Sequence, residues 1–220
     1  MKTAAQKNIA VLNHPLIKHN LAVLRDASTN TEAFNMALKR ISYALVFEAT
    51  KFLPTKTVKV KTPIKETENE IISDEIEIIA APILRAGLVF SDIVQNMLPF
   101  AHIHHLGMYR NEETLEPIWY YNKMKGKFKN PDKTYVFILD PMLATGNSGY
   151  DAVHNFVKQG IKQENIVFMS LISAPEGIER LTGAYPDIRI VTSQIDETLN
   201  EKGYIVPGLG DAGDRIFNTV

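Results

Sequence analysis

Residues 135–160 hold the clearest chemical pattern in the chain and read YVFILDPMLATGNSGYDAVHNFVKQG. An apolar run ends at Asp140, a loop of small residues follows, and apolar residues on one side of a helix lead to Gly160. A loop between a strand and a helix N terminus can bind an anion, because backbone N–H groups point outward at the positive end of the helix dipole. The pattern predicts an anion site, with an ordinary strand-to-helix turn as the alternative.

The loop within this segment has the donors that a phosphate group needs. The N–H groups of residues 144–148 can converge on one phosphate. The hydroxyls of Thr145 and Ser148 add donors, and Gly146 allows the backbone to approach the ligand closely. The loop lacks the Gly-Lys-Ser/Thr ending of a Walker P-loop and the GxGxxG pattern of dinucleotide-binding proteins. We therefore expect a phosphate site of another class.

Strands and helices in alternation must position this loop. From about residue 75 the chain has short apolar runs separated by segments of helix length, namely EIEIIAAPIL, AHIHHLGMY, YVFILD, NIVFMSLISA and IRIVTSQID. Such runs suit strands buried on both faces, and the alternation implies right-handed βαβ units. Ligands of such sheets bind at the carboxyl ends of the strands. The predicted fold class is α/β, with a mostly parallel central sheet flanked by helices.

The first third of the chain is predicted to be helical. Residues 31–53, TEAFNMALKRISYALVFEATKFL, place apolar side chains at the spacing of one helix face, with Thr31 as the expected N-cap and Pro54 as the stop. The apolar positions of this face are Phe34, Leu38, Ile41, Leu45 and, after a gap, Phe52.

Composition limits the classes of function. The chain has 220 residues with 24 Lys and Arg against 25 Asp and Glu, so no net charge favours nucleic acid or a membrane surface. Cysteine is absent, which excludes disulfides, thiolate catalysis and cysteine-ligated metals. No linker or repeat divides the sequence, so we expect one domain over residues 1–220. Without a signal-peptide pattern or an apolar run of about 18 residues, we expect a cytoplasmic protein outside the membrane.

Four sequence blocks resemble one enzyme family in the family's order. They are APILRAGL at 81–88, YRNEETLEPIWYYNKM at 109–124, DPMLATGNSG at 140–149 and EKGYIVPGLGDAGDR at 201–215. The chain resembles the uracil phosphoribosyltransferases, which have the type I phosphoribosyltransferase fold, from VLNHPL at 11–16 to GDAGDRIFNT at 210–219. The resemblance implies conversion of uracil and 5-phospho-α-D-ribose 1-diphosphate (PRPP) to UMP and diphosphate in UMP salvage. It also implies Mg²⁺ as the cofactor and a homodimer or higher homo-oligomer.

The resemblance also implies which residues bind PRPP. Arg85 and Arg110 correspond to arginines that contact PRPP, and Arg110 opens a hairpin running to Lys125 that resembles the family's flexible lid. A lid would keep water from a reactive ribosyl cation, whereas an ordinary surface hairpin is the alternative. The remaining PRPP-binding residues are expected to be Asp140, Pro141, Met142, Leu143, Ala144, Thr145, Gly146, Asn147, Ser148 and Asp211.

The last block resembles the family's base-binding loop. Backbone groups of Ile205, Gly210 and Ala212 are expected to read the edge of uracil, with Asp211 at the ribose side and as the candidate acceptor of the uracil N1 proton. Mg²⁺ is expected to be held mainly through PRPP, with no direct protein ligand. A purely structural Ω-loop is the alternative interpretation of this glycine-rich segment.

The sequence departs from the family pattern at Asn13, Asn111 and Asn147, where Asp, Asp and Gly are usual. Asparagine tolerates the left-handed conformation better than most residues, so we expect phosphate binding to be retained with Asn147. An RNA-binding pyrimidine regulator and a phosphoribosyltransferase for another base remain alternatives. The cluster of His102, His104 and His105 is interpreted as a polar strand edge rather than a zinc site, and Glu176 is given no role.

Overall fold

The computed structural model describes residues 8–111, 117–123 and 128–219. Its main sheet has the strand order β1-β11-β10-β8-β4-β6-β7, with β5 beside β4 and β9 beside β10. All of these pairs are parallel except β6–β7. The strands span Ile9–Val11 (β1), Glu77–Leu84 (β4), His102–Ile103 (β5), Leu106–Arg110 (β6), Pro117–Asn122 (β7), Thr134–Leu139 (β8), Met142–Leu143 (β9), Ile166–Ser173 (β10) and Arg189–Ile195 (β11).

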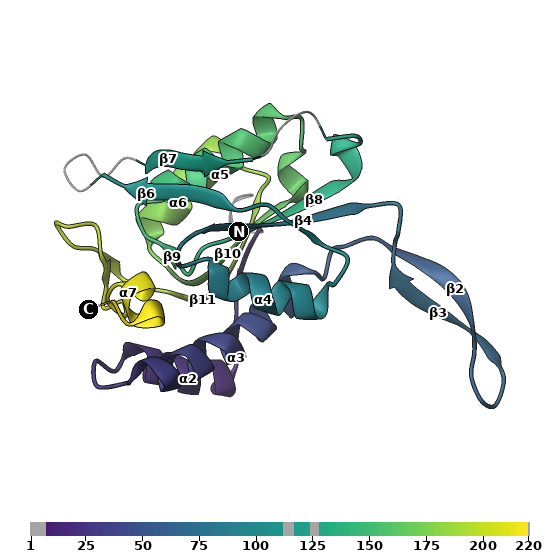
Figure 1. The fold of residues 1–220 in the computed structure, drawn as a ribbon, viewed down its shortest axis with the longest axis horizontal. Helices are drawn as coiled ribbons and strands as arrows, with labels where there is room; N and C mark the ends of the chain where they lie inside the picture. Colours follow the sequence, from purple (N-terminus) through teal and green to yellow (C-terminus); the bar gives the residue numbers. More distant parts are fainter. Residues whose placement is uncertain (1–7, 112–116, 124–127, 220) are drawn as a thin grey trace, which may run out of the picture.

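Helices cover both faces of this sheet, as expected (Figure 1). On one face lie α2 (Pro15–Arg25), α3 (Thr31–Ala49) and α4 (Leu88–Met97), and on the other lie α5 (Asn147–Lys158) and α6 (Pro175–Ala184). Because successive strand side chains point to opposite faces, Phe137 packs against the first layer and Val136 against the second. None of the helices in the described part of the chain is long and apolar enough to cross a membrane.

The helix predicted within residues 31–53 is confirmed for Thr31–Ala49, but the expected N-cap is wrong. Asn30 is the N-cap of α3, and its side chain accepts a 2.9 Å hydrogen bond from the N–H of Ala33. Thr31 is the first helical residue instead. Both residue types can cap a helix, so sequence alone does not separate neighbouring candidates. The helix ends at Ala49, and Phe52 lies in the turn that follows.

Residues 55–72 form an antiparallel hairpin that the sequence pattern did not predict. Strands β2 (Thr55–Lys61) and β3 (Glu66–Ile72) pair only with each other and project away from the main sheet (Figure 1). Ile64 at the tip is 93% exposed. Because neither face of the hairpin is buried, the strands lack the hydrophobic alternation by which a half-buried strand is recognised.

Two further short elements complete the C-terminal region. Strands β12 (Thr198–Leu199) and β13 (Ile205–Val206) form a second antiparallel pair, and the helix α7 spans Ala212–Phe217. Short 3₁₀ helices at Pro131–Lys133 and Gln163–Asn165 precede β8 and β10.

Candidate active site

A cavity of about 240 Å³ lies at the carboxyl end of β8, between the loop of residues 140–148 and the C-terminal loop. The two segments are far apart in the sequence, and the sheet brings them together. Of the expected site residues, those lining the cavity are Asp140, Met142, Leu143, Ala144, Thr145, Gly146, Asn147, Ser148, Ile205, Gly210, Asp211 and Ala212. The predicted position of the ligand at the strand ends therefore agrees with this cavity.

The loop of residues 140–148, which we call the phosphate loop after its expected ligand, runs directly into α5. Gly146 precedes the helix with φ of 79°, in the left-handed region that glycine adopts without strain. Asn147 is the first helical residue and does not need the left-handed conformation, which Gly146 takes instead. The helix start has no side-chain cap and no acidic residue in its first turn. Its N terminus can therefore receive an anion.

The carboxyl group of Asp140 has an unusually high pKa. Burial raises the pKa of Asp140 to about 7, although a hydrogen bond from the N–H of Met142, 3.3 Å from Oδ1, opposes the shift. The side chain is partly open to the cavity. A carboxyl group in this state can ionise when hydroxyl donors or a cation arrive beside it.

The C-terminal loop closes the other side of the cavity. It contains a cis bond between Val206 and Pro207 and a positive φ of 82° at Gly210. Asp211 caps α7, because its Oδ1 accepts a 3.0 Å hydrogen bond from the N–H of Asp214. One carboxylate oxygen of Asp211, the candidate proton acceptor, is therefore already occupied in capping α7.

Arg85 lies outside the described lining, whereas its neighbour Ala86 is part of it. The residue follows β4 across a cis Leu84–Arg85 bond. Its Nη2 is 3.5 Å from Oδ1 of Asp214, its guanidinium is 5.7 Å from the ring of Phe217, and its side chain is 58% exposed. An ion pair this exposed contributes little, so a ligand phosphate can compete for the arginine.

Other expected site residues are placed differently. Pro141 does not contribute to the cavity lining that the structure describes. The backbone of Arg110 ends β6 and pairs with Pro117, but its side chain lies outside the described part. Within the expected lid of residues 110–125, residues 112–116 and 124–125 also lie outside the described part. The described strand β7 is attached to α5, because Nε1 of Trp119 donates a 3.2 Å hydrogen bond to Asp151.

Sequence reasoning missed several lining residues. Most of them lie inside the blocks that carried the resemblance, so treating every residue of each block as a candidate would have found them. Phe168 gave no signal, because it belongs to a continuous apolar strand. The missed residues are Ala86, Gly149, Phe168, Gly203, Tyr204 and Gly213.

The remaining polar candidates lie apart from this cavity. In the described ranges no three His, Asp or Glu side chains are grouped so that they could hold a metal ion. Desolvation lowers the pKa of His104, which lies between β5 and β6. Glu176 accepts hydrogen bonds from the hydroxyl of Thr198 at 2.7 Å and the N–H of Leu199 at 3.1 Å, so it ties β12 to the start of α6.

Comparisons with known proteins agree with this geometry. A family model described as uracil phosphoribosyltransferase matches residues 11–219. The uracil phosphoribosyltransferase of Dictyoglomus thermophilum is 46% identical over 211 residues, which cover 96% of this chain and 99% of that protein. The enzyme of the same description from Streptococcus pneumoniae serotype 4 is 45% identical over 212 residues, covering 96% and 98%. The solved structure of the AQ2163 protein from Aquifex aeolicus superposes with a TM-score of 0.85 at 39% identity, covering 95% and 97%.

The parallel sheet and the phosphate loop at its carboxyl edge are those of the type I phosphoribosyltransferase fold. Within that class, the chain belongs to the uracil phosphoribosyltransferase family.

Proposed function

We propose that the protein transfers the phosphoribosyl group of PRPP to N1 of uracil, giving UMP and diphosphate for UMP salvage. The observation that supports this most strongly is the shared cavity, in which the phosphate loop 140–148 faces the loop that carries Ile205 and Gly210. Family membership supports the same reaction.

We assign the steps of the reaction to residues of the cavity together with Arg85 and Arg110. The N–H groups at the start of α5 and the hydroxyls of Thr145 and Ser148 bind the 5′-phosphate. Asp140 accepts hydrogen bonds from the ribose hydroxyls, which favours its ionised form. Arg85 and Arg110 stabilise the charge of the departing diphosphate. Uracil held under the ribose then needs only a short approach of N1, so positioning supplies much of the rate.

Base recognition is assigned to the backbone of the C-terminal loop. Groups of Ile205, Gly210 and Ala212 line the cavity and can pair with the edge of a small planar base. Asp211 lies beside them and is the candidate acceptor of the N1 proton, through the carboxylate oxygen that does not cap α7.

Mg²⁺ fits this cavity as a companion of PRPP. Mg²⁺ prefers oxygen ligands and is bound through one or two carboxylates together with substrate phosphates. Asp140 and Asp211 supply carboxylates in the cavity that also contains the phosphate loop. When bound, the ion would neutralise charge on the diphosphate. We propose that its ligands come mainly from PRPP.

We also propose a homodimer or higher homo-oligomer, in which the projecting hairpin of residues 55–72 contacts another subunit. Its exposed apolar side chains, Val60, Ile64 and Ile71, support this. Residues 1–220 are proposed to form one domain, because the central sheet pairs β1 near the start with β11 near the end. The cytoplasmic location stays a prediction.

The direct experiment is incubation with PRPP and Mg²⁺ and each free base in turn, with the nucleotide product identified by chromatography. Formation of UMP from uracil supports the proposal. A product from a purine instead of uracil would support the alternative of a different base, and tight RNA binding without any product would support a regulator.

A further inference from the structure

An ion pair between a buried aspartate and a partly exposed arginine lies behind the C-terminal loop. Asp196 directly follows β11, and its side chain is 2% exposed. Its Oδ1 lies 2.5 Å from Nη2 of Arg25, the last residue of α2. Its Oδ2 accepts a second hydrogen bond, of 2.9 Å, from Nη1 of the same arginine. Two parallel bonds of this kind fix the relative orientation of both side chains.

The ion pair binds both polar backbone groups of Gly208. Oδ2 of Asp196 accepts a 2.9 Å hydrogen bond from the N–H, and Nη1 of Arg25 donates a 2.8 Å bond to the carbonyl oxygen. Gly208 has φ of 61°, and a Cβ atom there would lie 2.1 Å from the carbonyl oxygen of Ile205. Only glycine fits this turn without displacing the chain. We refer to Arg25, Asp196 and Gly208 as the Gly208 clip.

A second arginine holds the next residue of the loop. Nη1 of Arg215 donates a 2.9 Å hydrogen bond to the carbonyl oxygen of Leu209, and its Nη2 donates a 2.7 Å bond to that of Asp26. Its guanidinium lies 4.3 Å from the centre of the Phe34 ring. Residues 208 and 209 are therefore attached to the end of α2 and the start of α3.

The cavity-lining parts of the loop lie on either side of these held residues. Ile205 precedes them and residues 210–212 follow them, and all of these line the cavity. Neither Arg25 nor Asp196 contributes to the described lining. The clip can therefore influence a bound base only through the backbone that it holds.

Burial of the Asp196 carboxylate makes this ion pair an inefficient way to stabilise the fold, because the lost hydration of that charge offsets most of its attraction to Arg25, whose side chain is 27% exposed. The pair does fix a geometry, since both carboxylate oxygens of Asp196 and both terminal nitrogens of Arg25 have defined partners. A binding site needs its contacting groups held to within about 0.5 Å. If backbone groups contact the base, their positions depend on the shape of the loop, so other residues must hold the loop in place.

We propose that Asp196 and Arg25 are positioning residues for the base. By holding Gly208, they keep the backbone groups of Ile205 and residues 210–212 aligned with the edge of uracil. This inference rests on the proposed function, because the loop reads uracil only if the protein is a uracil phosphoribosyltransferase. Loosening the clip weakens capture of the base and leaves the phosphate loop, which is held by α5, unchanged.

The test is Asp196→Asn, which keeps the side-chain shape and removes the charge that attracts Arg25. Steady-state kinetics should show that KM for uracil rises about tenfold or more, while KM for PRPP stays within about twofold. Amide hydrogen exchange of the free protein should be faster in residues 205–212 than in the wild type and unchanged in 134–139. A merely structural role would lower the active fraction, and therefore the apparent kcat, without changing KM for uracil.

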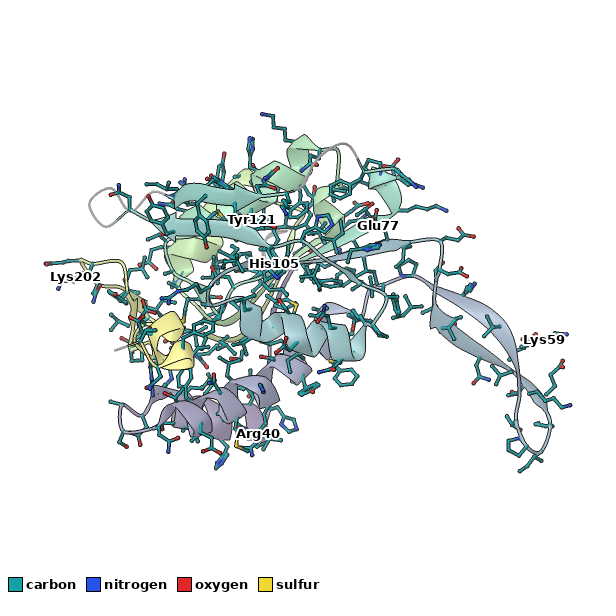
Figure 2. The ribbon with its side chains drawn as sticks, viewed as in Figure 1. Arg40, Lys59, Glu77, His105, Tyr121 and Lys202 are labelled. Carbon is teal, nitrogen blue, oxygen red and sulfur yellow. The ribbon has the colours of Figure 1, made fainter. Side chains whose placement is uncertain are left out.

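Glu77→Gln is the matched control, because it also converts a hydrogen-bonded carboxylate into an amide. Glu77 accepts a hydrogen bond from Thr134, where β8 begins, and lies across the molecule from Lys202 of the C-terminal region (Figure 2). It should leave both KM values unchanged. If Asp196→Asn does not fold, Arg25→Lys keeps the charge and loses the fork, and the same rise in KM for uracil is expected.

The outcomes separate the inference from the function. If the wild type forms UMP and both clip variants keep KM for uracil within about twofold, the inference is overturned and the function stands. If the wild type forms no UMP, the function fails. In that case unchanged hydrogen exchange in residues 205–212 of the variants would still overturn the clip as a holder of the loop.

Discussion

Asp140 lies where β8 opens into the phosphate loop, and burial raises its pKa to about 7. In the unfolded chain the same carboxyl ionises near its usual value of 3.8. Between these two pH values the folded protein holds one proton more than the unfolded chain. The free energy of unfolding therefore falls as the pH rises through this window, by the contribution of this one group. In the proposed function this loss in stability accompanies the placing of a carboxyl group beside the ribose of PRPP.

Asp140→Asn removes this titration. Raising the pH from 5 to 8 should lower the Tm of the wild type relative to that of the variant. At the higher pH only the wild type must bury an ionised carboxylate at this position. Thermal unfolding of both proteins without ligand at the two pH values measures the difference. A difference that is the same at both pH values would contradict the raised pKa.

Thr145→Val tests the phosphate loop. The change removes one hydroxyl donor at nearly constant volume, so PRPP binding should weaken by about 1 to 3 kcal/mol while the fold survives. Titration calorimetry with PRPP measures the loss. Thr182→Val is a suitable control, because its hydroxyl bonds only to the carbonyl oxygen of Ile178 within α6 among the contacts described. Equal PRPP affinity in the Thr145 variant and the wild type would show that the Thr145 hydroxyl does not bind a phosphate group of PRPP.

Arg85→Lys separates a ligand-binding arginine from a structural one. Lysine keeps the charge and loses the planar fork, so turnover should fall on the order of 10²-fold with little change in Tm, because the existing contact with Asp214 is exposed. Arg189→Lys at the start of β11 is the control for an arginine far from the cavity. A lower Tm with unchanged activity per folded molecule would assign Arg85 a structural role.

At the scale of elements, deletion of the hairpin of residues 55–72 tests whether it forms the proposed contact between subunits. Thr55 and Ile72 are register partners, so residues 56–71 can be replaced by an Asn-Gly turn between them. The shortened protein should keep the central sheet and lose self-association, because the exposed Ile64 is removed. Sedimentation velocity and circular dichroism measure the two properties. An unchanged oligomer would show that the hairpin is not the contact between subunits.

Sequence patterns predicted the parallel strands well, because burial on both faces leaves continuous apolar runs such as that of β10. They missed the β2–β3 hairpin, whose strands are stabilised by pairing with each other rather than by burial. The phosphate loop could be found because all its donors lie within a few residues of one another. The Gly208 clip could not, because Arg25 and Asp196 are separated by 171 positions and only the fold brings them together.

At the scale of the whole molecule, the central sheet acts as the frame for two loops. The phosphate loop follows β8, and the C-terminal loop is held by residues at the ends of α2 and β11. The sheet brings the proposed phosphate and base sites, which are far apart in the sequence, into one cavity. The central claim is that this cavity reads uracil through backbone groups.

The measurement that tests this claim most directly is kcat/KM for uracil and for cytosine, each with saturating PRPP and Mg²⁺. The two bases differ at position 4, where uracil has a carbonyl and cytosine an amino group. Backbone N–H groups facing that position would meet a second donor in cytosine, and the unpaired buried groups should lower kcat/KM for cytosine by about 10⁴-fold. Asp211→Asn should lower turnover without admitting cytosine, because a backbone reader is fixed by loop shape. Comparable kcat/KM values for uracil and cytosine in the unmodified protein would contradict the account.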